Sequence, residues 1–133
     1  LIKKNIITAV SIFSQYSTNT LIESNTFLEN AFILNDIIGA GRNDGIWTIK
    51  GNSFTGNNLY TAIRNTQHAI IKNNIIRGYS DGIVNQGKAT IENNEVSDNS
   101  HYGISTSVML DRFVGNNLFN NFEYDFHSDF ILS

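Results

Sequence analysis

The sequence predicts an all-β fold, a right-handed parallel β-helix (solenoid) of about six coils with a buried asparagine ladder. Three observations predict it: a motif that recurs every 20–27 residues, an alternation of apolar and polar residues within it, and an asparagine at its centre. Repeats of this length form solenoids, because one repeat cannot bury its apolar face until neighbouring repeats stack on it.

The motif reads apolar, two residues, asparagine, one residue, apolar, two residues, and usually a second asparagine. Its six copies start at Ile2, Ile22, Ile49, Ile71, Ile91 and Phe113. The central asparagines are residues 5, 25, 52, 74, 94 and 116, so successive differences are 20, 27, 22, 20 and 22. We expect each to occupy a tight corner in the left-handed backbone geometry that asparagine tolerates. The buried ladder is predicted to consist of Asn25, Asn52, Asn74, Asn94 and Asn116.

A second motif lies between these copies and is clearest at Asp81-Gly82-Ile83 and Tyr102-Gly103-Ile104. Apolar and polar residues alternate around both motifs, which indicates short strands with one buried face. A coil of 20–22 residues then holds three strands, with Trp47 in the core. The outward residues of the second strand are predicted to be Phe32, Leu34, Ala62, Arg64, Gly82, Val84, Gly103, Ser105, Asp125 and His127.

The 133 residues are expected to form a single β-helix domain, residues 1–133, with an inserted loop at residues 35–45. Three glycines favour a surface loop there, and the Ser- and Thr-rich stretch Ser11 to Thr20 is a smaller insertion. Phe126, Phe130, Ile131 and Leu132 are expected to form a last partial coil. Neither end shows a cap, and open coils expose strand edges. We therefore expect either adjoining sequence from a longer chain or end-to-end stacking on other copies.

The composition excludes several classes of partner and site. A net charge of −3 with nine scattered basic residues argues against nucleic acid and against an anionic membrane surface. The absence of cysteine removes disulfides and Cys-ligated metal sites. No apolar run approaches the roughly 18 residues that span a bilayer. No cofactor is predicted.

On these motifs the chain resembles the right-handed parallel β-helix repeat family, the broad group that includes pectate-lyase-like, alginate-epimerase-like and NosD-like proteins. The resemblance spans essentially the whole chain. It implies polysaccharide as the partner and an extracellular or cell-envelope location. The chain lacks the clustered aspartates of polygalacturonases, and the absence of proline excludes the Asp-Pro-His-Asp and Arg-x-Pro-x-x-Arg motifs of the epimerases and pectate lyases.

A leucine-rich repeat is the nearest competing fold, because it shares the apolar-x-x-Asn-x-apolar core. It requires a leucine three positions after the second apolar residue. Those positions hold Asn30, Asn57, Tyr79, Asn99 and Asn121, which favours the β-helix.

The candidate catalytic residues lie in the turn before the second strand. Asp81, His101 and Glu123 are one coil apart, so they can converge, and Arg64 is a candidate for neutralising substrate charge. If the chain is an enzyme, a polysaccharide lyase, hydrolase or epimerase is expected. The alternative is that Asp81 and His101 only make turn hydrogen bonds.

Four tyrosines near the same edge, Tyr60, Tyr79, Tyr102 and Tyr124, are predicted to bind substrate by stacking on sugar rings. The alternating Asp125, His127 and Asp129 could hold a metal ion, but a solvated strand face is favoured and no metal site is predicted. The competing function is a non-catalytic structural, adhesin or self-stacking fibre module.

Overall fold

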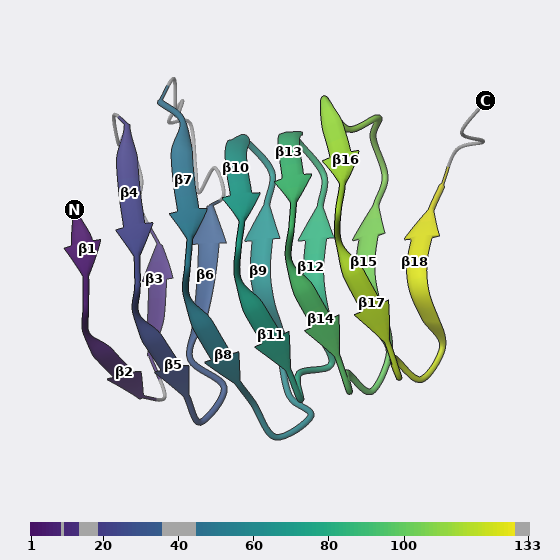
Figure 1. Ribbon diagram of the computed structural model, residues 1–133, viewed down its shortest axis with the longest axis horizontal. Helices are drawn as coiled ribbons and strands as arrows, with labels where there is room; N and C mark the ends of the chain where they lie inside the picture. The colour runs from purple at the N-terminus through teal and green to yellow at the C-terminus, as the bar shows by residue number, and fades with distance from the viewer. Residues whose placement is uncertain (9, 14–18, 36–44, 130–133) are drawn as a thin grey trace.

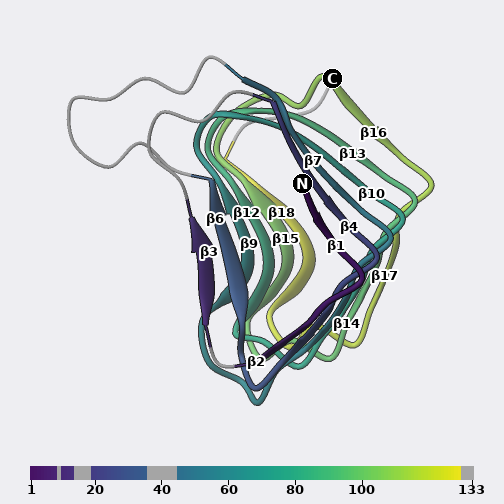
Figure 2. The same ribbon diagram turned by 90° about the vertical axis from the view of Figure 1, so that its left-hand side faces the viewer.

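The computed structural model describes residues 1–8, 10–13, 19–35 and 45–129 of the chain. These residues form 18 strands and no helix, with three strands in each coil (Figure 1). The strands belong to three parallel sheets, each containing one strand from every coil. Viewed at 90° to this, the coils superimpose as a three-sided outline with one sheet on each side (Figure 2).

Each sheet contains six strands in chain order. Sheet A consists of β1 (Ile2–Lys3), β4 (Thr20–Glu23), β7 (Trp47–Lys50), β10 (His68–Lys72), β13 (Lys88–Glu92) and β16 (Arg112–Val114). Sheet B consists of β2 (Ile6–Thr8), β5 (Thr26–Leu28), β8 (Ser53–Thr55), β11 (Ile75–Arg77), β14 (Glu95–Ser97) and β17 (Asn117–Phe119). Sheet C consists of β3 (Ser11–Phe13), β6 (Phe32–Asn35), β9 (Thr61–Asn65), β12 (Asp81–Asn85), β15 (Tyr102–Thr106) and β18 (Tyr124–Ser128). The predicted parallel solenoid is confirmed, and the right-handed sense of its coil stays a prediction.

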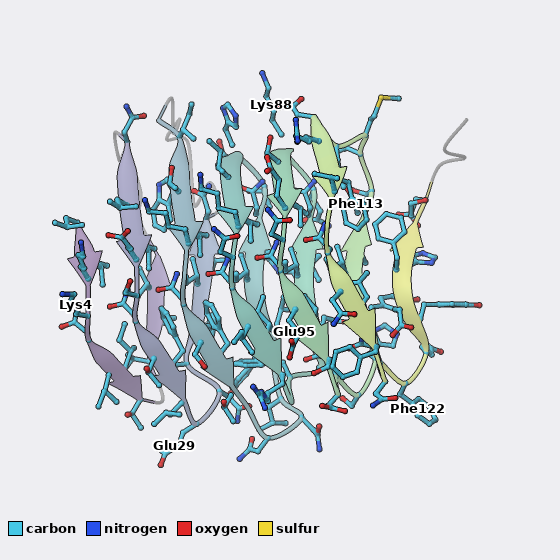
Figure 3. The ribbon with its side chains drawn as sticks, viewed as in Figure 1. Lys4, Glu29, Lys88, Glu95, Phe113 and Phe122 are labelled. Atoms are coloured by element: carbon cyan, nitrogen blue, oxygen red, sulfur yellow. The ribbon has the colours of Figure 1, made fainter. Side chains whose placement is uncertain are left out.

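The core is made of apolar columns that run along the solenoid axis. In sheet A, Ile22, Ile49, Ile71 and Ile91 are partners in successive strands, and all are fully buried. Sheet B contributes Phe27, Phe54, Ile76 and Val96, and sheet C contributes Ile33, Ile63, Ile83 and Ile104. Trp47 lies in the core as predicted, with 1% of its surface exposed. Side chains from the three sheets thus fill the interior, while charged side chains such as Lys4 and Glu95 and exposed aromatic ones such as Phe122 lie on the outside (Figure 3).

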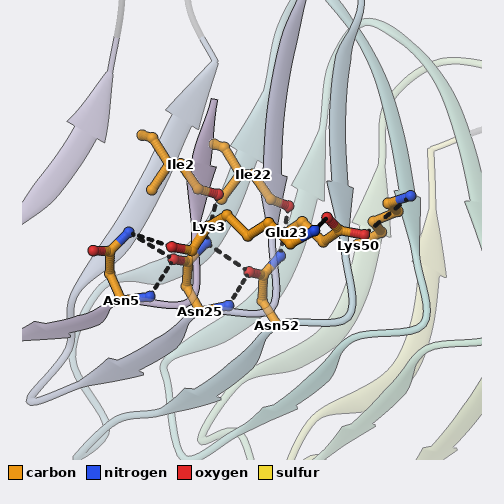
Figure 4. Close-up of polar contacts among 8 residues, drawn as sticks. All are labelled: Ile2, Lys3, Asn5, Ile22, Glu23, Asn25, Lys50 and Asn52. Atoms are coloured by element: carbon orange, nitrogen blue, oxygen red, sulfur yellow. Dashed lines mark hydrogen bonds and ion pairs between the residues drawn. The ribbon is translucent and has the colours of Figure 1, made fainter.

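The predicted asparagine ladder occupies the corner between sheets A and B. Each rung donates from its backbone N and its Nδ2 to the Oδ1 of the next rung; from Asn52 to Asn74 these distances are 3.0 and 3.1 Å. The same Nδ2 also donates to a backbone oxygen of the preceding coil, as Asn52 does to Ile22 O at 3.0 Å (Figure 4). Asn25, Asn52, Asn74 and Asn94 are buried, and Asn116 is half-buried. The ladder is therefore confirmed.

The prediction that the rungs themselves adopt the left-handed backbone conformation is wrong. Positive φ occurs one residue earlier, at Lys4, Ser24, Gly51, Asn73, Asn93 and Gly115. The turn is therefore made by the preceding residue, and the rung that follows does not have a positive φ. This division of labour explains pairs such as Asn73-Asn74 and Asn93-Asn94, because both positions favour asparagine for different reasons.

Two further polar rows lie at the other corners and were not predicted. At the end of the sheet C strands, Asn35 donates to Asn65 at 2.9 Å, Asn65 to Asn85 at 2.8 Å, and Asn85 to Thr106 at 3.2 Å. Between sheets B and C, Asn30 pairs with Asn57, and Asn99 donates to Asn121 at 2.8 Å. The described residues contain no buried side-chain nitrogen or oxygen without a partner.

The predicted outward face of sheet C is partly wrong. Ala62, Gly82 and Gly103 are buried, whereas Arg64 and Val84 face outward. A Cβ on Gly82 would collide with Val96 Cγ1 and lie 2.5 Å from Gly103 O, so only glycine fits there. Two consecutive buried positions in these strands interrupt the alternation on which the prediction relied.

Several sequence expectations fall outside the described residues. Of the insertion at 35–45, the structure describes only Asn35 and Gly45, and it describes Ser11 to Thr20 only at its ends. Phe130, Ile131 and Leu132 are also outside, whereas Phe126 lies in β18. Within the described ranges no helix is long and apolar enough to cross a membrane.

Candidate functional site

Asp81, His101 and Glu123 come together as predicted, where the strands of sheet C begin; this row of strand starts is called the edge of sheet C below. Asp81 is the first residue of β12, while His101 and Glu123 stand immediately before β15 and near the start of β18. Backbone bonds stack these turns: His101 N donates to Ser80 O and Glu123 N to His101 O, both at 2.9 Å. Three consecutive coils therefore present one side chain each to the same place.

His101 lies between the two carboxylates. Its Nδ1 is 2.8 Å from Asp81 Oδ1 and its Nε2 is 2.6 Å from Glu123 Oε2. Both contacts are hydrogen bonds to ionised carboxylates when each ring nitrogen carries a proton, which is the imidazolium form. Asp81 Oδ1 also accepts a bond from Tyr102 N at 3.1 Å. Asp81 is thus fixed by its neighbours, and its side chain is 18% exposed against 50% for Glu123.

An aromatic cluster adjoins His101. The Tyr102 ring lies 3.7 Å from the His101 ring and is stacked on His127 at 4.8 Å with an interplanar angle of 7°. Tyr124 stacks on Tyr102 at 6.0 Å. Desolvation raises the pKa of the Tyr102 hydroxyl above its usual value, and the charge of Glu123 adds to this effect. The cluster is partly exposed and lies beside the His101 imidazole.

Tyr79 is not a surface residue, and its prediction as a substrate-binding residue is wrong. It is fully buried, its ring meets the edge of Phe54 at 6.4 Å, and its hydroxyl donates to Ala31 O at 2.6 Å. Burial raises its pKa strongly. It occupies a slot that asparagine fills in other coils, so its ring points into the core.

Tyr60 stands immediately before β9, one coil before the Asp81 turn, and Arg64 lies farther along β9. Tyr60 is 61% exposed and its ring packs against Phe32 at 5.5 Å. Arg64 is the register partner of Val84, whereas Asp81 pairs with Thr61. Three residues along a strand correspond to about 10 Å, so Arg64 does not join the His101 cluster.

Sequence reasoning missed His127 as part of the aromatic cluster. Its signal was available, because His127 is outward and follows Ser105 in the register of sheet C. The described residues contain no group of three His, Asp or Glu side chains that could hold a metal ion, so they give no support to a metal site at Asp125, His127 and Asp129. Asp125 instead accepts bonds from Asn121 N and Nδ2, at 3.1 and 2.9 Å, and His127 Nε2 contacts Asp129 at 3.1 Å.

Comparisons with protein-family models, with curated proteins and with solved structures give no match to this chain.

Proposed function

We propose that this chain binds a polysaccharide along the outer edge of sheet C and acts on it at His101. The single observation that carries the proposal is the imidazole held between Asp81 and Glu123, directly beside the ring of Tyr102, on which Tyr124 stacks. Aromatic faces bind the apolar faces of sugar rings, and an imidazole with a carboxylate on each side can donate or accept a proton.

The three side chains have different roles in this proposal. Asp81, fixed by Tyr102 N, holds the imidazole in one orientation. Glu123 is exposed enough to move aside for a substrate or to take a proton from it. His101 transfers a proton at Nε2 to or from the bound sugar. Such a set serves a lyase, a hydrolase or an epimerase, the activities that the resemblance to pectate-lyase-like β-helix proteins suggests, in an extracellular or cell-envelope setting.

The test is incubation of the chain with a panel of acidic and neutral polysaccharides, measuring both retention and new chain ends. We expect His101→Ala to lower turnover by about 10²-fold or more, the usual contribution of general acid–base catalysis. His68→Ala is the matched control, because His68 lies on sheet A. Equal turnover in the His101→Ala variant would exclude the catalytic role, and retention without new chain ends in wild type would leave a binding protein.

A second candidate function is a self-stacking structural module, and one observation favours it. Asn116 N and Asn5 Oδ1 have no hydrogen-bond partner among the described residues. A rung needs its N to donate to the Oδ1 of the next rung, so a second copy placed end to end would continue the ladder from Asn116 to Asn5. The strands β16, β17 and β18 would then pair with β1, β2 and β3 of that copy.

Light scattering against protein concentration tests this alternative. The monomer has a mass of 14.9 kDa, and stacking predicts an apparent mass that grows with concentration. Asn5→Lys would place an ammonium group against the Asn116 N–H and should hold the chain as a monomer. Wild-type mass that stays at the monomer value over the full concentration range would exclude this function.

A further inference from the structure

Sheet C carries a hollow on its outer face, one coil away from Asp81. It has a volume of about 260 Å³ and is lined by Phe32, Leu34, Tyr60, Thr61 and Arg64. Phe32 and Leu34 come from β6, and Thr61 and Arg64 from β9. Ala62 and Ile63, which lie between Thr61 and Arg64, are both fully buried and do not line the hollow.

The two ends of this recess differ in chemistry. Phe32 and Tyr60 form an aromatic wall at one end, with their ring centroids 5.5 Å apart and an interplanar angle of 38°. Arg64 stands at the other end, about 10 Å along the strand from Thr61. The described residues offer its guanidinium no carboxylate partner. An unpaired cation beside apolar side chains favours an anionic group on an apolar body.

The backbone at Tyr60 supports a role for this ring. Tyr60 has a φ of +58°, in the left-handed region that bulky residues rarely adopt. Such strain is held in place only where the surrounding structure determines it, and here Ser80 N donates to Tyr60 O at 3.0 Å. The strained turn places the ring beside Phe32 and leaves 61% of Tyr60 exposed.

Charge fixes the orientation of a ligand. On the far side of the Phe32–Tyr60 wall lies a wider hollow that contains Glu29. An anion would be repelled there and attracted to Arg64. We propose that the recess binds a small aromatic carboxylate, with its ring against Phe32 and Tyr60 and its carboxylate on the Arg64 guanidinium.

This site does not depend on the chemistry at His101. The same carboxylate chemistry could reach the recess on a free aromatic acid or on a uronic acid unit of a polysaccharide. The aromatic walls and the apolar Leu34 favour the first source, because a planar ring buries its whole face against them.

The test is an NMR titration of the 133-residue chain with phenylacetate, with phenethylamine as the probe of opposite charge and glucuronate as the sugar acid. We expect a dissociation constant on the order of 1 mM for phenylacetate, as is usual for about ten non-hydrogen atoms. Shifts should be confined to β6, β9 and Tyr60. Phenethylamine should not bind, and glucuronate should bind more weakly than phenylacetate.

Two variants and one control decide the assignment. Arg64→Gln should weaken phenylacetate binding about tenfold, because a charge-assisted pair is lost. Phe32→Leu should weaken it while keeping the preference for anions. Arg77→Gln, an exposed arginine on sheet B, should bind as wild type does. Thermal melts confirm that each variant is folded.

Several outcomes would overturn the proposal. These are no phenylacetate binding, equal binding by Arg64→Gln, or shifts centred on other strands. Tighter binding of glucuronate would assign the recess to the polysaccharide instead. Equal polysaccharide turnover in wild type and His101→Ala, with phenylacetate binding intact, would refute the proposed catalytic role and leave this site standing.

Discussion

Two corners of the solenoid satisfy their buried polar groups in different ways. Between sheets A and B the ladder runs unbroken from Asn5 to Asn116, and each rung is bonded to the next through two donors. Between sheets B and C the row is split, because Tyr79 stands where an asparagine would join Asn57 to Asn99. Tyr79 N donates to Asn99 Oδ1, and its hydroxyl finds Ala31 O. A rung is thus replaceable where another residue both satisfies the backbone and fills the space.

The largest loss of stability is expected from removing one rung of the unbroken ladder between sheets A and B. Asn74→Ala leaves the Asn52 N–H and one Asn52 amide proton without partners, and it removes the bond that Ile49 O accepts from Asn74. Each unpaired buried group costs about 1–3 kcal/mol, so we expect a loss of at least about 2 kcal/mol in unfolding free energy. Urea denaturation measures it.

The matched control is Asn5→Ala, at the exposed end of the same ladder. Its loss should stay below about 1 kcal/mol, because water replaces the bonds that are removed. Similar losses for the two variants would show that burial does not set the strength of a rung.

Restoring an asparagine at the split corner should destabilise the protein. Tyr79→Asn completes the sequence pattern but removes a fully buried ring that packs on Phe54. Truncating a buried aromatic costs about 3–5 kcal/mol, which exceeds the roughly 1 kcal/mol net gain of a new hydrogen bond. We expect a net loss of about 2–4 kcal/mol in urea denaturation; a gain in stability would mean that ladder continuity outweighs packing.

Tyr79→Phe tests the burial of the Tyr79 hydroxyl through the pH dependence of the unfolding free energy. Burial raises the pKa of Tyr79 in the folded state, so its neutral form contributes stability in full below the unfolded value near 10. That stability is lost as pH rises above this value, by about 1.4 kcal/mol for each pH unit.

The Tyr79→Phe variant should therefore lose less stability than wild type between pH 10 and 11, although it starts about 1 kcal/mol lower for want of the Ala31 bond. Tyr60→Phe removes a hydroxyl at an exposed position and is the matched control. Equal slopes for wild type and Tyr79→Phe would contradict the burial of this hydroxyl.

The smallest effect is expected on the solvent side of the first coils. Glu23 contacts Lys3 at 2.9 Å and Lys50 at 3.2 Å, beside the ladder corner but facing outward (Figure 4). Both lysines lower the pKa of Glu23 through hydrogen bonds. Because the ion pairs face solvent, we expect Glu23→Gln to cost little unfolding free energy, and less still in 1 M salt. A loss that salt does not reduce would contradict this.

The sequence predicted the fold because its strongest signal, the motif around Asn25, Asn52 and Asn74, reports the axial stacking directly. It misplaced the left-handed residue by one position, because the pairs Asn73-Asn74 and Asn93-Asn94 look alike at both places. It misassigned Tyr79, because a tyrosine in a polar slot is typical of a surface and only the packing shows it buried.

The grouping of Asp81, His101 and Glu123 was predictable for the same reason as the ladder. Their separations, 20 and 22 residues, match the coil period, so they fall in one axial row. Arg64 and His127 were predicted to face outward, but their neighbours were not predicted. Those neighbours depend on the position along the strand, which the coil period does not give.

The spacing between successive rungs of the ladder does not depend on how many residues separate them in the sequence. Consecutive rungs are separated by 20 residues at Asn74 and Asn94 but by 27 at Asn25 and Asn52, and the bonds are alike. Lengthening a loop from 20 to 27 residues changes its closure free energy by only about 0.3 kcal/mol. Each coil therefore contributes one rung to this corner, whatever the number of residues in the coil. Segments could be spliced into a coil between rungs, to decorate the surface, without changing the pitch.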